Sequence, residues 1–296
     1  MTRPAEVVAT GLGVPEGPFV HADGAVTFTE QIRGRISRWD GRGGASVVAL
    51  TGGAPNSHVA GPGGVLYACQ NGGVVGGWRS PQPATPGIQV VAVDGTVTDH
   101  ATAVAGAPLL APNDLVVTGD GDIVFTDPGH PFDPVARGTA GRLVRLSPSA
   151  PASGEVLLDV GATYCNGLAL EADGTLVWVE SYGRHVCRLV DGARVEVCRL
   201  PEGHVPDGLA VATDGRLFIA TCGSHGVTVV APDGEVLELI ELDDDANATN
   251  CCFDGDGALW VTDFGMDWET REGAGRLWRV ETDATGLPVP FGPTPR

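Results

Sequence analysis

Six positions of this sequence carry nearly the same chemistry, and each lies seven residues before a tight turn. They are Glu16, Asn56, Asn113, Asn166, Asp207 and Thr249, with Asn250 beside the last. Five of the six are carboxylates or carboxamides, in a chain in which only 19% of the residues are charged. Oxygen donors of this kind are the ligands of a hard divalent cation such as Ca²⁺, whereas zinc sites are usually built from Cys and His. The pattern predicts a site for one divalent metal ion, although any single member could instead cap a turn.

The turns that follow these positions repeat along the chain. Their second glycines stand at positions 24, 64, 121, 174, 215 and 257, at intervals of 40, 57, 53, 41 and 42 residues. Each turn is followed by a run rich in β-branched and aromatic residues, such as residues 123–127. Strand signals that recur at this period, without helical periodicity, are typical of a β-propeller with one four-stranded blade per repeat. We therefore predict a single all-β domain over residues 1–296, a six-bladed propeller with four antiparallel strands in each blade.

In such a propeller the six positions begin the innermost strands, so their side chains should converge on one mouth of the central tunnel. We call them the ring residues. The last repeat supplies only three strands, near residues 251–253, 258–263 and 276–280, whereas residues 5–10 form a strand without a blade of its own. The N-terminal strand is therefore predicted to complete the last blade and to close the ring without an exposed edge. The Pro- and Gly-rich tail after Thr282 is expected to fray.

Three insertions interrupt the repeat, at residues 71–87, 128–141 and 263–275. Each follows a second strand that returns toward the ring residues, which predicts that the three loops lie over that mouth of the tunnel. Loops on a rigid scaffold often carry substrate recognition. The candidates for the wall of a substrate pocket are Trp78, His130, Phe132 and Trp268, and the alternative for each is packing within its own loop.

Two other sets of polar residues have a regular place in the sequence. The second strands end on Glu30, Gln70, Asp127, Glu180, Thr221 and Asp263. These positions are one strand further from the axis, so we predict that they are structural or that they orient the ring residues by hydrogen bonding. The histidines that could shuttle protons, or could simply bond within loops, are His58, His130, His204 and His225.

Composition limits the partners of this protein. The formal net charge of −19 argues against binding to nucleic acid or to an anionic membrane. No basic and apolar leader opens the sequence, and no apolar run reaches membrane-spanning length. The seven cysteines are scattered through strand positions, as expected for reduced thiols. We therefore expect a cytoplasmic monomer or small homo-oligomer that acts on a small molecule.

The chain resembles the gluconolactonase / senescence-marker-protein (regucalcin) / luciferin-regenerating-enzyme family of six-bladed propellers. The similarity lies in the segments PEGP (15–18), PND (112–114), FTDP (125–128), NGLAL (166–170), PDGLAV (206–211) and TNCCFDG (249–255). The resemblance implies one divalent metal, commonly Ca²⁺ or Zn²⁺, held by Glu16, Asn166 and Asp207. It also implies that Asn113 is a further ligand or a substrate contact. Sugar-lactone hydrolases of the family often carry an Arg where this chain has Ala111, and the loss of that side chain favours a substrate less polar than an aldonolactone.

The favoured function is metal-assisted hydrolysis of a lactone or a related ester. The cation would polarise the carbonyl group, and Asp207 is the candidate general base because it stands across the tunnel from Glu16. The alternative is a lyase, isomerase or cyclase that uses the same metal to stabilise an enolate. Phosphotriester hydrolysis and a non-enzymatic calcium-binding role are further hypotheses. Ca²⁺ is the favoured ion, and Zn²⁺, Mg²⁺ and Mn²⁺ are the other candidates.

Overall fold

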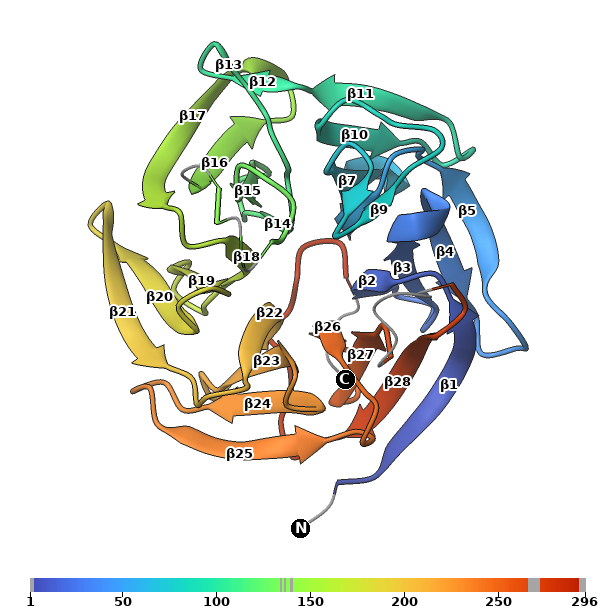
Figure 1. The fold of residues 1–296 in the computed structure, drawn as a ribbon, viewed down its shortest axis with the longest axis vertical. Coiled ribbons are helices and arrows are strands. Elements are labelled where there is room, and N and C mark those ends of the chain that lie inside the picture. The colour runs from blue at the N-terminus through green and yellow to red at the C-terminus, as the bar shows by residue number, and fades with distance from the viewer. Residues whose placement is uncertain (1–2, 134, 136, 139–140, 266–271, 293–296) are drawn as a thin grey trace.

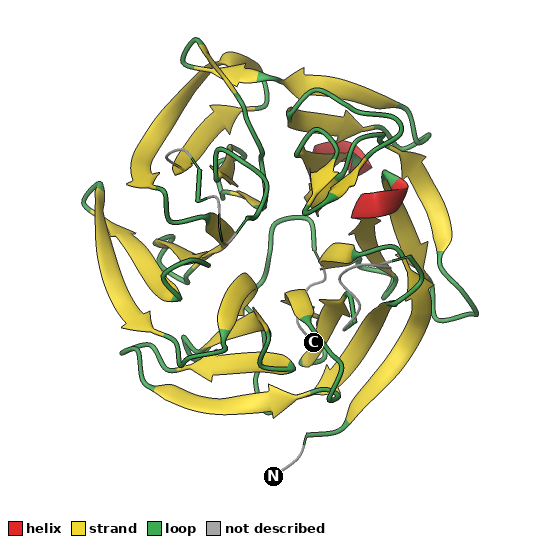
Figure 2. Cartoon of the chain, viewed as in Figure 1, coloured by secondary structure: helices red, strands yellow, loops and turns green. Residues whose placement is uncertain are grey.

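The chain folds as a six-bladed β-propeller. The computed structural model describes residues 3–133, 135, 137–138, 141–265 and 272–292. Six four-stranded antiparallel sheets surround a central tunnel (Figure 1). Figure 2 shows strands joined by loops, and the helices among the described residues are two short 3-10 helices, Gln31–Arg33 and Pro62–Gly64. The predicted fold class is confirmed.

The six blades follow one another along the chain, and in each blade the strands pair in order from the tunnel outward. Blade one has β2 (Pro15–Val20), β3 (Val26–Glu30), β4 (Arg35–Trp39) and β5 (Ser46–Leu50). Blade two has β6 (Pro55–Ala60), β7 (Leu66–Gln70), β10 (Gly87–Val91) and β11 (Val97–Ala101). Blade three has β14 (Leu115–Val117), β15 (Ile123–Asp127), β16 (Gly141–Ser147) and β17 (Ala150–Gly161). Blade four has β18 (Cys165–Leu170), β19 (Leu176–Glu180), β20 (His185–Val190) and β21 (Ala193–Arg199). Blade five has β22 (Val205–Val211), β23 (Leu217–Cys222), β24 (Gly226–Val230) and β25 (Val236–Glu241). Blade six has β26 (Ala248–Phe253), β27 (Ala258–Asp263), β28 (Gly275–Glu281) and β1 (Ala5–Leu12).

The repeated turns and the second strands explain why the blades form. The second glycine of each of the six turns has a φ between 82° and 90°, which an L side chain rarely adopts. The strands that follow are buried on both faces because they lie between neighbouring blades. Four of their large side chains, Phe28, Phe125, Trp178 and Phe218, are fully buried. The hydrophobic core is therefore spread around the ring, between the sheets.

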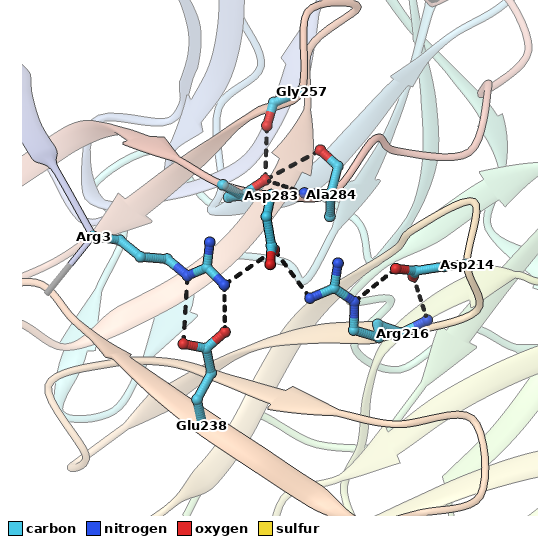
Figure 3. Close-up of polar contacts among 8 residues, drawn as sticks. Arg3, Asp214, Arg216, Glu238, Gly257, Asp283 and Ala284 are labelled. Atoms are coloured by element: carbon cyan, nitrogen blue, oxygen red, sulfur yellow. Dashed lines mark hydrogen bonds and ion pairs between the residues drawn. The ribbon is translucent and has the colours of Figure 1, made fainter. Parts of the chain in front are cut away.

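The N-terminal strand closes the ring as predicted. β1 pairs with β28 in antiparallel register, from Ala5 opposite Val280 to Leu12 opposite Gly275. Arg3, just before β1, donates to Glu238 Oε1 on β25 at 2.6 Å and to Asp283 Oδ1 at 3.0 Å. Arg216 also donates to Asp283 Oδ1, at 3.0 Å (Figure 3). These ion pairs join blade five to Arg3 before β1 and to the segment that follows β28, the two strands of blade six furthest from the tunnel.

The prediction that the tail after Thr282 frays is wrong for the residues that the structure describes. Thr213 N–H donates to the Thr285 carbonyl at 2.8 Å, and Leu287 N–H donates to the Val211 carbonyl at 2.9 Å. The segment then crosses the middle of the ring (Figure 1). Its apolar residues cover the end of the tunnel that the inner strands leave open. These contacts hold the segment in place, although it is too rich in Pro and Gly to form a strand. We call residues 284–292 the C-terminal strap.

Two small hairpins extend the blades. β8 (Val74–Val75) pairs with β9 (Trp78–Arg79) within the insertion of blade two. β12 (Ala103–Val104) pairs with β13 (Ala107–Pro108) in the connection from blade two to blade three. Across the described residues, no helix has the length and hydropathy that a membrane span requires. All seven cysteines are free thiols.

Candidate metal centre and substrate cavity

The six ring residues meet in one cavity at one mouth of the tunnel. The cavity has a volume of about 280 Å³ and is lined by Glu16, Asn56, Asn113, Asn166, Asp207 and Thr249. We call it the ring cavity. Five of these residues lie on the innermost strands β2, β6, β18, β22 and β26, and Asn113 lies just before β14. The structure therefore brings together the positions that the repeat selected.

A break in strand pairing turns these side chains toward the axis. In five blades the register between the first and second strands shifts at the ring residue, as between Pro206 and Leu209 around Asp207. Such a bulge rotates the side chain out of the normal alternation. Gly167 follows Asn166 in one bulge, and a Cβ added there would lie 2.5 Å from the carbonyl oxygen of Asp207. The two inner strands can approach so closely here because this residue is glycine.

The last residues of four second strands hold the backbone just before the ring residues by side-chain hydrogen bonds. Gln70 Oε1 accepts a hydrogen bond from Ala54 N–H, and Asp127 Oδ1 accepts one from Ala111 N–H, both at 2.8 Å. Equivalent bonds run from Gly13 N–H to Glu30 Oε2 at 2.8 Å and from Asn247 N–H to Asp263 Oδ1 at 2.7 Å. In these four blades the second-strand residue therefore anchors the backbone two or three residues before the ring residue. Because the second-strand side chain bonds to the backbone, the ring side chain itself is left to face the cavity.

Two carboxylates, the buried Glu16 and the half-buried Asp207, dominate the electrostatics of the ring cavity. Glu16 is 2% exposed, and its Oε2 accepts its nearest hydrogen bond from Gly17 N–H at 2.6 Å. Burial, and then the nearby Asp207, raises the pKa of Glu16 well above its usual value. Burial likewise raises the pKa of Asp207, whose Oδ2 lies 3.6 Å from the thiol of Cys222. None of the described residues that line the cavity is Lys, Arg or His. The cavity thus holds two acids without a side-chain cation to balance them.

The remaining donors fit a hard cation. Asn166 Nδ2 donates to Ser181 Oγ at 3.0 Å, which leaves the amide oxygen available to the cavity. Asn56 Oδ1 is buried without a hydrogen-bond partner. Within the described part of the chain, no three His, Cys, Asp or Glu side chains gather closely enough to hold a metal ion by themselves. A divalent ion would therefore need carboxamide oxygens beside the two carboxylates, and the ring provides them.

The wall of the ring cavity is largely apolar and aromatic. Its apolar members include Val14, Val74, Val75, Phe132, Tyr164, Val205 and Phe264. Phe132 and Tyr164 stack edge to face, with their ring centroids 5.0 Å apart. Tyr164 is 6% exposed, and burial raises the pKa of its hydroxyl above the usual value. This tyrosine was not among the predicted site residues, but it stands two residues before a ring residue, as Val14 and Val205 do.

The other predicted wall residues occupy different places. Ala111 is buried and donates its N–H to Asp127, but it is not among the described residues that line the ring cavity. Trp78 packs on the small cluster of Val14, Ala54, Val75 and Phe264 at the rim. His130 Nε2 is 3.0 Å from the Tyr182 hydroxyl, within the aromatic group behind Phe132. Trp268 lies outside the described residues.

The candidate proton-shuttle histidines lie away from the ring cavity. His204 Nδ1 is 2.8 Å from Thr228 Oγ1, and His225 Nδ1 is 3.0 Å from the Ala246 carbonyl. His58 lines a second cavity at the opposite end of the tunnel. None of the four candidates is among the described residues that line the ring cavity. The titratable groups that do line it are Glu16, Asp207, Cys222 and Tyr164.

Comparisons with known proteins agree with this architecture. A curated gluconolactonase of Zymomonas mobilis is 27% identical over 283 residues, which cover 86% of this chain and 76% of that protein. The solved structure of a gluconolactonase from Xanthomonas campestris is 25% identical, covers 94% of this chain and 89% of its own, and has a TM-score of 0.74. A calcium-binding protein, regucalcin, from Agrobacterium tumefaciens has a TM-score of 0.75 at 16% identity, over 100% of this chain and 98% of its own, and shows the fold alone. The family model described as "SMP-30/Gluconolactonase/LRE-like region" matches residues 14–262. The chain therefore belongs to the SMP-30/gluconolactonase/LRE-like family.

Proposed function

We propose that the protein is a divalent-metal-dependent hydrolase that opens a small lactone, or cleaves a related ester, less polar than an aldonolactone. The observation that carries this proposal is the ring cavity itself, where two carboxylates and the three carboxamides of the ring residues converge without a Lys, Arg or His among the described lining residues. Membership of the family supports the lactonase reaction. The donor chemistry supports a hard metal ion.

Glu16, Asn166 and Asp207 would hold the cation, with Asn113 as a fourth donor or as a substrate contact. Ca²⁺ is the ion that best matches an all-oxygen set of carboxylates and carboxamides. When bound, the cation supplies Lewis-acid polarisation of the ester carbonyl. Without it, the buried negative charges of Glu16 and Asp207 repel each other and are poorly solvated.

Asp207 is the residue placed to move the proton. Its carboxylate would take a proton from the attacking water while the water oxygen bonds to the carbonyl carbon. The ring C–O bond of the lactone then breaks, and Asp207 returns the proton to the departing alkoxide. Burial raises the pKa of Asp207 in the metal-free protein, whereas a bound cation lowers it, so the alternative role of Asp207 is coordination alone, with the water activated at the metal. The products are the hydroxy acid and the regenerated carboxylate.

The wall of the cavity supports an uncharged substrate with an apolar body. A substrate carboxylate or phosphate would find no cationic side chain among the described lining residues, whereas Phe132, Tyr164 and Phe264 offer aromatic surface. Ala111 itself offers no hydrogen-bond donor to substrate hydroxyl groups, whereas an Arg at this position could bind several of them. We therefore expect alkyl or aryl lactones to be better substrates than aldonolactones.

The test is a lactone panel with metal control. Purified protein is analysed for metal content, and hydrolysis of glucono-δ-lactone, γ-nonalactone and dihydrocoumarin is measured with chelator and after addition of Ca²⁺, Mg²⁺, Mn²⁺ or Zn²⁺. The proposal expects one metal ion per chain, loss of hydrolysis with chelator, recovery with one of the ions, and a higher kcat/KM for the two less polar lactones. Full hydrolysis by metal-free protein would overturn the metal role, and a preference for glucono-δ-lactone would overturn the assignment of substrate polarity.

A further inference from the structure

The far end of the tunnel contains a second cavity, which the proposed reaction does not use. Its volume is about 440 Å³. It is lined by the innermost strands of all six blades and is covered by the C-terminal strap through residues 287–290. We call it the far cavity. Cavities of this size in other proteins accommodate small organic ligands.

A polar constriction separates the two cavities. Residues that face the far cavity follow the ring residues directly in the chain, as Asp114 follows Asn113 and Asn250 follows Thr249. Asn250 Nδ2 is 3.4 Å from Asp114 Oδ2, so the two side chains meet across the tunnel. A Cβ at Gly208 would lie 2.0 Å from Asn250 Cγ, so the amide fits here only because position 208 is glycine. A molecule in the far cavity therefore does not share space with a substrate in the ring cavity.

Most of the wall of the far cavity is apolar. The apolar members include Phe19, Leu115, Val117, Leu168, Leu209, Val211, Phe253, Leu287 and Val289. None of the described residues of this wall is Lys or Arg. Its two carboxylates already have partners, because Asp114 accepts from Leu115 N–H at 2.9 Å and Glu171 pairs with Arg188 at 2.8 Å. The wall therefore suits an uncharged molecule.

One polar atom in this wall has no partner. His58 lines the far cavity and is 3% exposed. Its Nε2 lies 2.7 Å from Thr27 Oγ1, but its Nδ1 is buried without a hydrogen-bond partner. A buried polar atom left unpaired costs free energy that a ligand group could recover. Among the described polar residues of this wall, His58 is the one with an unpaired buried atom, and a small shift of the imidazole ring would bring Nδ1 to the surface of the cavity.

We propose that the far cavity is a binding site for a small uncharged molecule with an apolar body and one hydrogen-bonding group, which pairs with His58 Nδ1 beneath the C-terminal strap. At one end the strap is bonded through Leu287 to Val211 at the end of β22 and through Thr285 to Thr213, two residues beyond β22. Over the cavity it presents two prolines, which have no backbone N–H, and the side chain of Val289. Entry therefore requires displacement of mainly apolar contacts.

The test uses phenol and toluene, which share a ring but differ in the hydroxyl group, with the full-length protein. Binding is followed by NMR through the backbone amides of β6 and the strap. The proposal expects saturable shifts of these amides with both probes and about three- to tenfold tighter binding of phenol, the effect of one hydrogen bond. In His58→Leu this preference should vanish while toluene still binds. In Ala169→Phe, which adds volume at a half-buried position of the wall, both probes should bind at least about tenfold more weakly.

Phe132→Ala is the matched control, because it alters the aromatic wall of the ring cavity and leaves the far cavity intact. Its probe affinities at the far cavity should equal those of the wild type. Circular dichroism establishes that each variant is folded, and His58→Leu alone decides the question if Ala169→Phe does not fold. The proposal is overturned if the probes shift only amides around the ring cavity. It is also overturned if His58→Leu keeps the full preference for phenol.

Discussion

At the scale of single residues, Asp207 connects the site to the stability of the protein. Its folded-state pKa is raised by burial, so without metal the stability decreases as the pH rises from the ordinary Asp value through the folded value. In Asp207→Asn the buried charge is absent. We expect metal-free Asp207→Asn to melt about 2–4 °C above the metal-free wild type, because each kcal/mol shifts the melting temperature of a chain this large by about that amount. Its affinity for Ca²⁺ should fall by about 100-fold or more.

Calorimetric titration with Ca²⁺ and thermal unfolding in chelator measure the two effects of Asp207→Asn. Glu202→Gln, at an exposed position just before β22, is the matched control and should change neither quantity. A variant that binds Ca²⁺ as tightly as the wild type would contradict the ligand role. Hydrolysis that returns fully at saturating Ca²⁺ would show that Asp207 is a ligand and not the base.

The identity of residue 111 should decide how polar a substrate the cavity accepts. Val14, Tyr164 and Val205 stand two residues before ring residues and line the cavity, and Ala111 has the same place before Asn113. In Ala111→Arg a guanidinium would therefore reach the cavity and could bind substrate hydroxyl groups. We expect the ratio of kcat/KM for glucono-δ-lactone to that for γ-nonalactone to rise about tenfold or more. Ala111→Leu is the control for added bulk, and an equal change in both variants would contradict the hydrogen-bonding explanation.

His58 should make the protein sensitive to mild acid. Burial lowers the pKa of His58 to about 3, whereas the unfolded chain has an ordinary His pKa of about 6.5. Between these values the unfolded state binds the extra proton, so the free energy of unfolding falls as the pH falls, by up to about 1.4 kcal/mol per pH unit. His58→Gln should lose this component and show a shallower decline from pH 7 to pH 5. Urea unfolding at pH 7, 6 and 5 measures both slopes, and equal slopes would contradict the prediction.

The sequence predicted the ring residues because their position in a repeat can be counted. It did not predict Tyr164, because whether the second residue before a ring position faces the cavity depends on the backbone conformation there. Val14 and Tyr164 both have positive φ, 54° and 56°, which no pattern of hydrophobicity reveals. Long-range contacts decide the remaining wall residues, such as Cys222 at the end of β23 beside Asp207.

At the scale of structural elements, the residue at the end of the second strand supports the site from behind in four blades. Asp127 on β15 is fully buried, pairs with Arg142 at 2.9 Å and accepts a hydrogen bond from Ala111 N–H. Asp127→Ala would leave both donors without this acceptor, and removal of one partner of a buried pair typically costs about 3–5 kcal/mol. We expect a loss of this size in the free energy of unfolding and lower hydrolytic activity, because the chain before Asn113 loses its anchor.

Asp120→Ala is the matched control for Asp127→Ala on the same blade. Asp120 pairs with Arg145 on the surface, where its side chain is 64% exposed, and exposed pairs contribute about 0–1 kcal/mol. Urea unfolding of both variants and the wild type gives the comparison. Similar losses in the two variants would show that the buried pair has no special role in supporting the site.

The repeat predicted the strands of the blades well because each blade has the same turn and the same buried second strand. It gave no register inside the insertions. The β8–β9 hairpin and the position of Trp78 at the rim of the cavity therefore could not be predicted and are seen only in the structure. The bulges at the ring residues were not predicted either, although Gly17, Gly167 and Gly208 directly follow three ring residues and an isolated glycine in a strand is a signal of a bulge.

At the scale of the whole molecule, closure of the ring was predictable and the path of the tail was not. Closure follows from the number of strands. The last repeat has three strands and the N-terminal strand has no blade, so only their pairing leaves no exposed edge. The C-terminal strap has no periodic pattern, and its contacts are with inner strands from several blades. Only the assembled tunnel creates the apolar surface that the strap covers.

The closing strand should therefore control the integrity of the whole ring. β28 carries the buried residues Leu277, Trp278 and Val280, and β1 covers its outer edge. Deletion of residues 1–12 would expose this edge and remove the ion pairs of Arg3 with Glu238 and Asp283, so we expect lower stability and concentration-dependent aggregation. A synthetic peptide of residues 1–12 should reverse the aggregation, followed by light scattering, and raise the melting temperature, because it can pair with β28. A scrambled peptide of the same composition is the control. Wild-type stability of the shortened chain without peptide would show that three strands suffice to close the last blade.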